Sequence, residues 1–490
     1  MFKTLSDKHP RDKDLPGRAH NLTVLKAVLD GTLYDVQPYQ FHEERSGGGE
    51  YIPVADRAPG VRYQLCRMVV EDSISLLFGD NHFPGVQTDD EPTRDALAGL
   101  IRETHLDAVM TDAAIRGSVG SVAIRLRVLK QRVFFDVCET IFLTPEYDPE
   151  APDVLIGILE RYKVKGRDLA AQGYVVTEDN LGADHWFQRQ WDTENETWFL
   201  PLLVTDAAEG KKPKVDTARS VNHGLGFCPW VWIKNLPGGD GIDGLCTFRG
   251  AINTQIEIEY QLSLGARALK YSASPTLLLK EPSGTNGQIQ IAAGDTIVVD
   301  KDGDGKWLEI DGGASEAVRE YVRLMREMAI ESIHGNRSNA DKVSAAQSGR
   351  ALELLHQPLI WLTDKLRITY GECGLLPLLN LVVRAAQKYP LKVKGKSVVL
   401  AGDADLSLAW PRWFPATSAD RSSDANTLRT LTGAGLMSEQ TAIKQLVPVY
   451  DIADERAEIA AIADDQAKSD ARAAAQAAQI KATEAIPQSA

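Results

Sequence analysis

The sequence lacks the features that mark several large classes of protein. Its five cysteines are scattered, odd in number and without a C-x-x-C spacing, which favours a reducing, intracellular environment over a disulfide framework. The first residues, MFKTLSDKHPRDKD, contain no apolar stretch, so we expect no secretory signal. The longest apolar run near a helix, GLLPLLNLVV at 374–383, has about half the length that spans a bilayer, and we expect no membrane contact.

Catalytic and cofactor motifs are also missing from the sequence. It contains no G-x-S-x-G and no H-E-x-x-H. The G-K-S at 395–397 resembles the end of a phosphate-binding loop, but Pro390 stands where the first glycine of that loop belongs. Glu257 and Glu259 lie two residues apart on a predicted helix, so their side chains point in different directions. We therefore expect no enzymatic activity, no cofactor and no bound metal.

Acidic residues outnumber basic ones, which limits how the protein meets nucleic acid. The chain has 490 residues, 43% of them hydrophobic, with a net charge of -14 and a pI near 5.2. This length exceeds one ordinary core and predicts roughly two to four domains. The negative charge argues against a protein that grips DNA by neutralising its phosphates, but it is compatible with one past which DNA slides.

What is present is organised around residues 243–335. A long helical pattern, a Gly/Pro/Asp-rich segment with strand-like pieces and a second helical pattern follow one another there. Apolar residues recur in the first pattern from Phe248 to Leu264, and in the second from Val318 to Ile333. The second also carries Leu324 and Ile330 off its main stripe. We therefore expect neighbours to cover more than one face of these helices.

The chain before this stretch predicts a mixed α+β region. Residues 1–20 are charged and are expected to form a mobile lead-in, followed by a short helix around Leu22–Leu29. Two further helices are predicted over 61–79, with Gly79 as its stop, and over 93–117. From 118 to 234 the period changes to two, which predicts one antiparallel sheet with a turn at Asp192–Glu196. Its strands are expected at 121–128, 131–137, 185–192, 197–204 and 228–235.

The chain after this stretch is mostly helical. A polar loop at 336–347 separates the second helical pattern from the longest predicted helix, 348–389, which should kink at Pro358 and Pro377. A pair of strands is predicted next, and then three helices, the second of them capped by Ser438. The strands are expected at 392–401 and 405–411, and the helices at 418–435, 438–446 and 451–485.

The closest local match to a known metal site is DKDGDGKWLEID at 300–311. Asp300, Asp302, Asp304 and Gly305 fit the calcium-loop pattern, but Asp311 stands where that loop has a bidentate glutamate. The residues before it predict a strand, whereas a helix enters such a loop. We interpret this segment as an acidic hairpin turn and keep its three aspartates as candidate calcium ligands.

Several phrases, taken in order, resemble the portal protein of tailed bacteriophages, the ring at one capsid vertex through which DNA is packaged. HGLGFCPWVWIKN before a long helix looks like the passage from that family's wing into its stem. SPTLLLK, a β segment and a returning helix are similar to its clip between two stem helices. SGRALELL resembles the helix start after its tunnel loop, and WFPATSADRSS with the helices after it resembles its crown. LCRMVVEDSISLLFG is similar to its N-terminal helix.

The resemblance implies a portal-like α+β fold with an α/β wing, a two-helix stem, a small β-containing clip, a long kinked helix and a helical C-terminal crown. The implied boundaries are a lead-in at 1–60, the wing at 61–242, stem helices at 243–273 and 315–335, the clip at 274–314, the tunnel loop at 336–347, the long kinked helix with wing return strands at 348–416, and the crown at 417–490.

The resemblance also implies a function without catalysis. About twelve subunits would form a ring that conducts double-stranded DNA during packaging and ejection, without sequence-specific binding. The implied partners are the terminase, whose ATPase is the motor, a head-completion or adaptor protein, and the major capsid and scaffold proteins. Residues 274–312 would form the face that meets the terminase and later the head-completion protein. The ring would be assembled in the host cytoplasm and reside at the portal vertex of the virion.

The resemblance assigns roles to two sets of residues. The tunnel loop would face DNA through Arg337, Ser338, Asn339, Asp341, Lys342 and Val343. The stem would pair arginines with glutamates of a neighbouring subunit, through Glu316, Arg319, Glu320, Arg323, Arg326 and Glu327. Two alternatives stay open. One is a calcium-dependent structural or adhesion protein that uses 300–311, and the other is a helical capsid scaffold or adaptor, suggested by the Ala-rich C-terminus.

Overall fold

The computed structural model describes residues 1–11, 16–79, 81–272, 276–282, 299–308, 313–334, 353–354, 356–414, 418–446 and 455–484. The protein is mixed α+β, with 49% helix, 19% strand, several small antiparallel sheets and one 32-residue helix, so the predicted α+β class is confirmed. Contacts divide the chain into two compact units. The first is Met1–Arg337 with Pro358–Trp410, and the second is Ser338–Gln357 with Pro411–Ala490.

The N-terminal residues belong to the main core, so the expected mobile lead-in is wrong for the described part. Leu5 on α1 is buried, and most apolar side chains of α2 join the same core. α3 (Leu65–Phe78) confirms the helix predicted over 61–79, with Gly79 directly after its last residue. The elements are α1 (Phe2–Lys8), α2 (Gly17–Leu29), β1 (Tyr39–Gln40), η1 (Val54–Asp56), β2 (Arg57–Ala58) and α3 (Leu65–Phe78).

The helix predicted over 93–117 is two helices. After β3 (Gly85–Gln87), α4 (Glu91–Thr104) begins at Asp90, whose carboxylate accepts a hydrogen bond from the amide of Thr93 at 2.9 Å. It ends because His105 takes the left-handed conformation, with φ of 49°. α5 (Leu106–Gly117) begins at the next residue.

Four of the five predicted strands are confirmed, but they lie in two antiparallel sheets instead of one. The strand predicted at 197–204 is wrong, because that segment holds the end of one strand, a separate two-residue strand and the start of a short helix. The smaller sheet has the order β12-β4-β5, from β4 (Ser121–Leu129), β5 (Arg132–Glu139) and β12 (Trp230–Lys234). The larger has the order β11-β9-β8-β7-β6, with β10 also on β8. Its strands are β6 (Leu143–Tyr147), β7 (Leu155–Lys165), β8 (Asp184–Trp191), β9 (Asn195–Trp198), β10 (Leu202–Leu203) and β11 (Val221–Asn222).

Three of these strands, β6, β7 and β11, were not predicted. The turn expected at Asp192–Glu196 does lie between β8 and β9, although β9 already begins at Asn195. Short helices decorate the larger sheet: α6 (Gly166–Ala171), η2 (Glu178–Asn180) and α7 (Val204–Ala208).

The long predicted helix is present from Gln357 and contains a π-helical segment. Its parts are α11 (Gln357–Leu366), the π-helical η5 (Arg367–Leu375) and α12 (Leu376–Lys388). Pro358 lies in the first turn of α11, where a missing N–H disrupts no helical hydrogen bond, so a kink there is not required. Pro377 directly follows η5, whose wider turns relieve the clash between a proline ring and the preceding turn.

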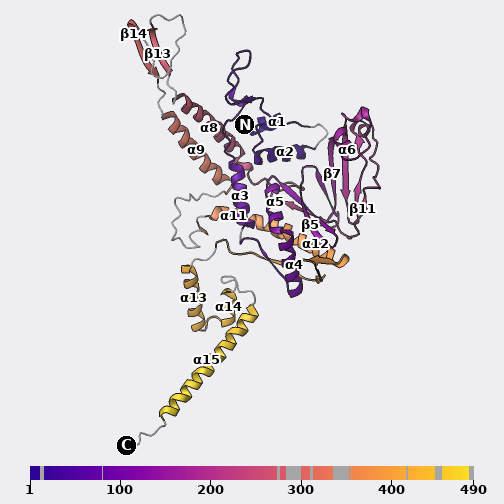
Figure 1. The fold of residues 1–490 in the computed structure, drawn as a ribbon, viewed down its shortest axis with the longest axis vertical. Coiled ribbons are helices and arrows are strands. Elements are labelled where there is room, and N and C mark those ends of the chain that lie inside the picture. The colour runs from indigo at the N-terminus through magenta and orange to yellow at the C-terminus, as the bar shows by residue number, and fades with distance from the viewer. Residues whose placement is uncertain are drawn as a thin grey trace. The chain divides into compact units, whose positions relative to one another are not determined.

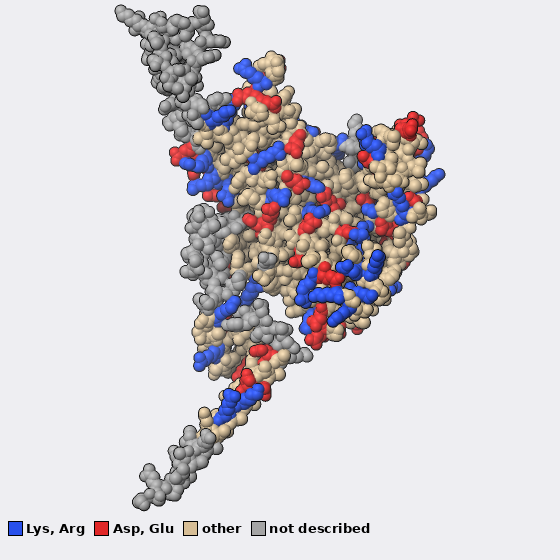
Figure 2. Space-filling model, in the orientation of Figure 1, with Lys and Arg blue, Asp and Glu red and all other residues tan. Residues whose placement is uncertain are grey.

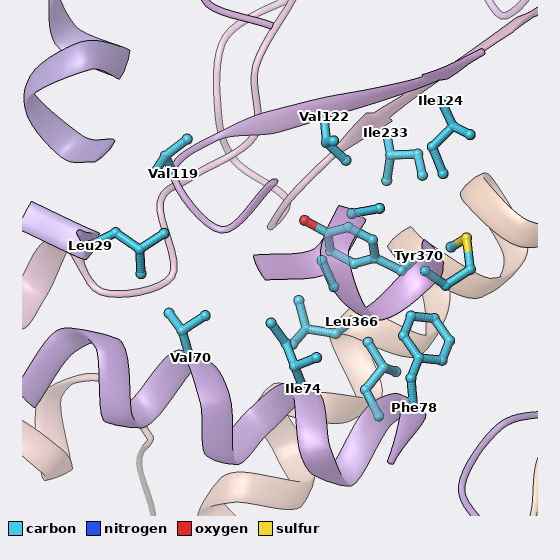
Figure 3. Close-up of a cluster of buried hydrophobic side chains, with 14 of the residues drawn as sticks. Leu29, Val70, Ile74, Phe78, Val119, Val122, Ile124, Ile233, Leu366 and Tyr370 are labelled. Carbon is cyan, nitrogen blue, oxygen red and sulfur yellow. The ribbon is translucent and has the colours of Figure 1, made fainter. Parts of the chain in front are cut away.

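The long helix lies in the core between α3 and the smaller sheet. Figure 3 shows Val70, Ile74 and Phe78 of α3 facing Leu366 and Tyr370, with strand residues on the other side. By length and composition alone Gln357–Lys388 passes the test for a membrane span. However, 56% of its most apolar window is buried inside the protein, as in the core helices of globular proteins.

The two strands predicted after the long helix do not pair with each other. The first segment makes its own hairpin, and the second pairs with β3, far away in sequence, because Leu408 lies opposite Val86. The strands are β15 (Leu391–Val393), β16 (Lys396–Val398) and β17 (Ser407–Ala409).

The second unit confirms the three C-terminal helices. They are α13 (Ser418–Gly433), α14 (Glu439–Leu446) and α15 (Glu455–Glu484). Ser438 caps α14 as predicted, since its hydroxyl accepts a hydrogen bond from the amide of Thr441 at 3.2 Å. The described side chains of α15 are nearly all exposed.

The helix–β–helix order predicted in mid-chain is confirmed. After η3 (Arg249–Ala251) come α8 (Ile252–Ser272), the antiparallel pair β13 (Thr276–Pro282) and β14 (Val299–Leu308), and α9 (Gly313–Ser332). Figure 1 shows α8 and α9 side by side, leading away from the sheets of the first unit to β13 and β14.

The acidic segment belongs to β14, so it is not the hairpin turn that the sequence predicts. Asp304 is paired with Lys280 of β13. Asp300 and Asp302 lie between the pairs Val299–Pro282 and Asp304–Lys280, where the register of the two strands shifts. Their role as calcium ligands stays a prediction. Asp311 lies outside the described residues.

Candidate functional site: the hairpin of α8 and α9

Close packing of α8 against α9 follows from a small residue at their contact. A Cβ on Gly265 would lie 2.9 Å from Cγ1 of Val318, so glycine lets the two helices approach. Farther along α9, Ala329 and Ile333 are buried in the main core. The α9 face predicted from Val318 to Ile333 is therefore the face that packs.

A second apolar stripe on α9 is open to solvent. Tyr321, Leu324 and Met328 are 43%, 52% and 55% exposed. Their spacing of three and four residues places them on one side of the helix. Of the two off-stripe residues predicted from sequence, Leu324 belongs to this exposed stripe, whereas Ile330 is buried in the main core.

The predicted stem residues all lie on α9 and are all exposed, including Arg326 and Glu327. Within the chain, Arg319 contacts Glu316 at 3.5 Å, and Arg323 contacts Glu320 at 2.8 Å. Such exposed pairs within one helix contribute about 0–1 kcal/mol, so these arginines can change partners at little cost. Pairing with glutamates of a neighbouring subunit stays a prediction.

The predicted DNA-facing residues Arg337, Ser338, Asn339, Asp341, Lys342 and Val343 lie outside the residues that the structure describes. After α9 the described residues end with His334, which has a left-handed φ of 55°. Their role therefore stays a prediction.

A buried carboxylate holds the base of α8. Glu259 is 1% exposed and accepts a hydrogen bond from the hydroxyl of Tyr34 at 2.5 Å. The amides of Tyr63 and Gln64 donate to it at 3.0 and 3.2 Å, and Nε2 of Gln255 donates at 3.2 Å. Four donors from three parts of the sequence thus converge on one side chain, tying α8 to the segment between α2 and α3.

Burial dominates the electrostatics of this cluster. It raises the pKa of Glu259, while the hydrogen bonds from Tyr34 and the two amides, together with the charge of Arg62, act to lower it. Burial also raises the pKa of the Tyr34 phenol, and the neighbouring carboxylate raises it further. Tyr34 therefore stays a neutral donor, and Glu259 is the group of this pair that titrates.

The raised pKa of Glu259 predicts a pH-dependent contribution to stability. In the unfolded chain this group has an ordinary glutamate pKa of about 4.3. Because the native pKa is higher, Glu259 contributes stability that is fully present below the unfolded value and is lost as pH rises through the native value. Urea titrations between about pH 4 and 7 measure the free energies of unfolding of the natural protein and of Glu259→Gln. The value for the natural protein minus the value for the variant should decrease with rising pH. If this difference in free energy stayed constant with pH, the native pKa of Glu259 would not be raised.

The chain entering the hairpin is fixed by an ion pair. Arg18 of α2 donates two hydrogen bonds to the Asp243 carboxylate, at 2.6 and 2.8 Å. The hydroxyl of Ser121 on β4 donates to the same carboxylate at 2.5 Å. The segment before α8 is therefore tied to both a helix and a sheet, which makes the base of the hairpin rigid.

Sequence reasoning missed the anchoring role of Glu259. It considered this residue with Glu257, whose side chain does point elsewhere and accepts a hydrogen bond from Gln261 at 2.8 Å. The available signal was a polar stripe in an apolar helix, because Gln255, Glu259 and Ser263 are four residues apart and all buried.

The described residues contain no group of three or more His, Cys, Asp or Glu side chains placed to hold a metal ion. A comparison of the chain with protein-family models finds no match, and a comparison with curated proteins finds no similar sequence.

Proposed function

We propose that the chain is a portal-type ring subunit, through which double-stranded DNA is packaged into a viral capsid and later ejected. The observation that carries the proposal is the exposed stripe of Tyr321, Leu324 and Met328 on a hairpin that is otherwise anchored firmly. An apolar stripe on a projecting hairpin favours a partner over solvent.

A second copy of the chain is the occupant that this stripe fits best. One flank of α9 packs on its own α8 and the core, and the adjacent flank stays open. A copy rotated about an axis would cover the open flank with a different surface, and such head-to-tail contacts close into a ring when the rotation closes. The loosely held Arg319 and Arg323 lie on the same helix and can pair with glutamates of that copy.

Within this proposal each part of the chain has a role. The sheets and their helices form the wing, α8 and α9 the stem, β13 and β14 the clip, and the helices of the second unit the crown. The tunnel loop at 336–347 faces DNA without reading its sequence. The clip meets the terminase and then a head-completion or adaptor protein, and the ring sits at the portal vertex among capsid and scaffold proteins after assembly in the host cytoplasm. The chain itself catalyses no reaction.

The alternatives differ in support. A calcium-dependent structural or adhesion protein is less favoured, because Asp300, Asp302 and Asp304 lie in β14 and not in a loop between two helices. A helical scaffold or adaptor is favoured by α15, which has 30 residues and nearly all of its described side chains exposed. This second candidate predicts association without an axial channel.

The decisive experiment combines negative-stain microscopy with mass measurement of the purified protein. We expect rings with an axial hole. Leu324→Glu together with Met328→Glu should reduce these rings to single subunits, because each interface would bury two charges without partners. A monodisperse monomer of the natural protein at high concentration, or assemblies without a hole, would contradict the portal proposal.

The matched control carries the same charge change on exposed apolar residues elsewhere. Val175 is 102% exposed and Val215 is 49% exposed, both in the segments around the larger sheet. The variant with Val175→Glu and Val215→Glu should form the same rings as the natural protein. Loss of rings in both variants would mean that added negative charge, not the α9 stripe, controls assembly.

A further inference from the structure

Two hairpin turns from distant parts of the sequence lie against each other at one edge of the first unit. The β4–β5 turn contains Lys130 and Gln131, and the β15–β16 turn contains Lys394. The amide of Lys392 donates to the carbonyl of Gln131 at 2.8 Å. The amide of Lys394 donates to the Glu103 carboxylate of α4 at 2.6 Å. These bonds hold both turns in place.

The two turns gather exposed cations, which we call the lysine edge: Lys130, Arg132, Lys392, Lys394 and Lys396. Arg132 contacts Glu103 at 3.2 Å. In the described part of the chain, none of the four lysines has a carboxylate within 4.0 Å of its ammonium group. Figure 2 shows Lys and Arg side chains clustered at the lower right of the face, where Figure 1 places β5, α4 and α12.

The sequence places these lysines outward in two ways. In β15, the side chains of Leu391 and Val393 are buried, so the alternation of a strand turns Lys392 to the exposed face. At the turns, Lys130 and Lys394 have φ of 48° and 50°. Glycine and asparagine are favoured at such left-handed positions, so both lysines have a backbone conformation that is uncommon for their residue type.

We propose that the lysine edge binds the phosphate backbone of nucleic acid, without regard to base sequence, on a surface separate from the hairpin of α8 and α9. Lysine is depleted at protein–protein interfaces, whereas it is a common contact to phosphate. Convex turns place point charges along a surface but offer no group that enters a groove to read bases. A net charge averaged over the chain conceals such a local patch, and this inference goes beyond the ring proposal.

The main competing explanation is that the lysines protect an exposed strand. β5 is an edge of its sheet, and lysines on edge strands prevent pairing with other chains. The two explanations differ in what charge reversal does. Loss of protection produces aggregation, whereas loss of a phosphate site weakens DNA binding by a protein that stays dispersed.

The test measures fluorescence anisotropy of two labelled duplexes of unrelated sequence, each about 30 base pairs long, with the full chain at increasing salt. Affinity should be equal for the two duplexes. It should fall with salt, with a log–log slope of about -0.9 per phosphate contact, or about -4.5 for the five cations acting together. The triple change Lys392→Glu, Lys394→Glu and Lys396→Glu should weaken binding at least about tenfold and reduce the slope by about three.

The matched control reverses three exposed lysines near the larger sheet. Lys211→Glu, Lys212→Glu and Lys214→Glu change the net charge by the same amount as the triple change in the lysine edge. Binding by this control should stay within about twofold of the natural protein. The proposal would be overturned if both triple variants lost the same DNA affinity, if the two duplexes bound with unequal affinity, or if the natural protein did not bind at low salt. It would also be overturned if the triple variant of the lysine edge aggregated while its DNA affinity stayed unchanged. So would equal competition by polyglutamate, which would indicate an acidic protein partner.

Discussion

Glu259→Ala should lower the free energy of unfolding of the first unit by about 3–5 kcal/mol, because it leaves several buried donors without an acceptor and each costs about 1–3 kcal/mol. The donors are the hydroxyl of Tyr34, the amides of Tyr63 and Gln64, and the side-chain amide of Gln255. Gln64 itself has a left-handed φ of 50°. The hydrogen bond from its backbone amide to Glu259 therefore also stabilises a strained backbone conformation.

The measurement is urea unfolding, made in the background of Leu324→Glu and Met328→Glu so that assembly adds nothing to stability. Hydrogen exchange should show faster exchange of the amides of Tyr63 and Gln64. The control is Glu257→Ala, which removes one bond to Gln261 within the same helix and should cost at most about 1 kcal/mol. Equal losses for the two variants would mean that Glu259 does not anchor α8.

Gly117→Ala should destabilise the first unit by about 2–4 kcal/mol, because the space for a side chain there is already filled. A Cβ would lie 2.2 Å from the hydroxyl oxygen of Tyr370 and 3.0 Å from Cγ1 of Val122. Tyr370 is fully buried and donates to the side-chain oxygen of Asn235 at 3.0 Å, so it has little freedom to move. Urea unfolding in the same unassembled background measures the loss.

A second substitution tests this contact directly. Tyr370→Phe removes the oxygen that clashes but leaves Asn235 without its donor, at a cost of about 1–3 kcal/mol. The double variant should therefore lose clearly less stability than the sum of the single variants. At Gly433 in α13, no described residue outside the local helix backbone lies within 4 Å of the Cβ position, so Gly433→Ala should be neutral or slightly stabilising. Additive losses for Gly117 and Tyr370 would contradict the packing described.

Local patterns were sufficient to predict the regular elements that bury one face. The alternation in SVAIRLRV predicted β4, and the helical spacing before Gly79 predicted α3. Both signals depend on neighbours in sequence, so they survive without knowledge of tertiary contacts. The strand β7, LIGILERYKVK, was missed because charged residues interrupt its apolar alternation.

Contacts between distant residues decided the features that the sequence did not reveal. DKDGDG has the composition of a turn, yet it is part of β14, and the register with β13 shifts within it. His105 breaks a continuous helical pattern through its own backbone conformation. From sequence, Glu259 resembles an ordinary surface glutamate, because its hydrogen-bond donor Tyr34 lies 225 residues away in the chain. The candidate stripe was found only in part, because sequence shows that an apolar residue exists but not which side of a helix the core covers.

The π-helical segment in the long helix has a consequence for how this protein tolerates change in length. The wider turns of Arg367–Leu375 set the phase between α11 and α12. Removing one residue there and restoring α-helical turns would rotate α12 by about 100° relative to α11. Leu378, Leu379 and Val382, now buried, would turn away from the core. The number of residues between the two helices therefore determines whether both buried faces point to the core. Insertions or deletions in this stretch should destabilise the protein, whereas surface loops tolerate them.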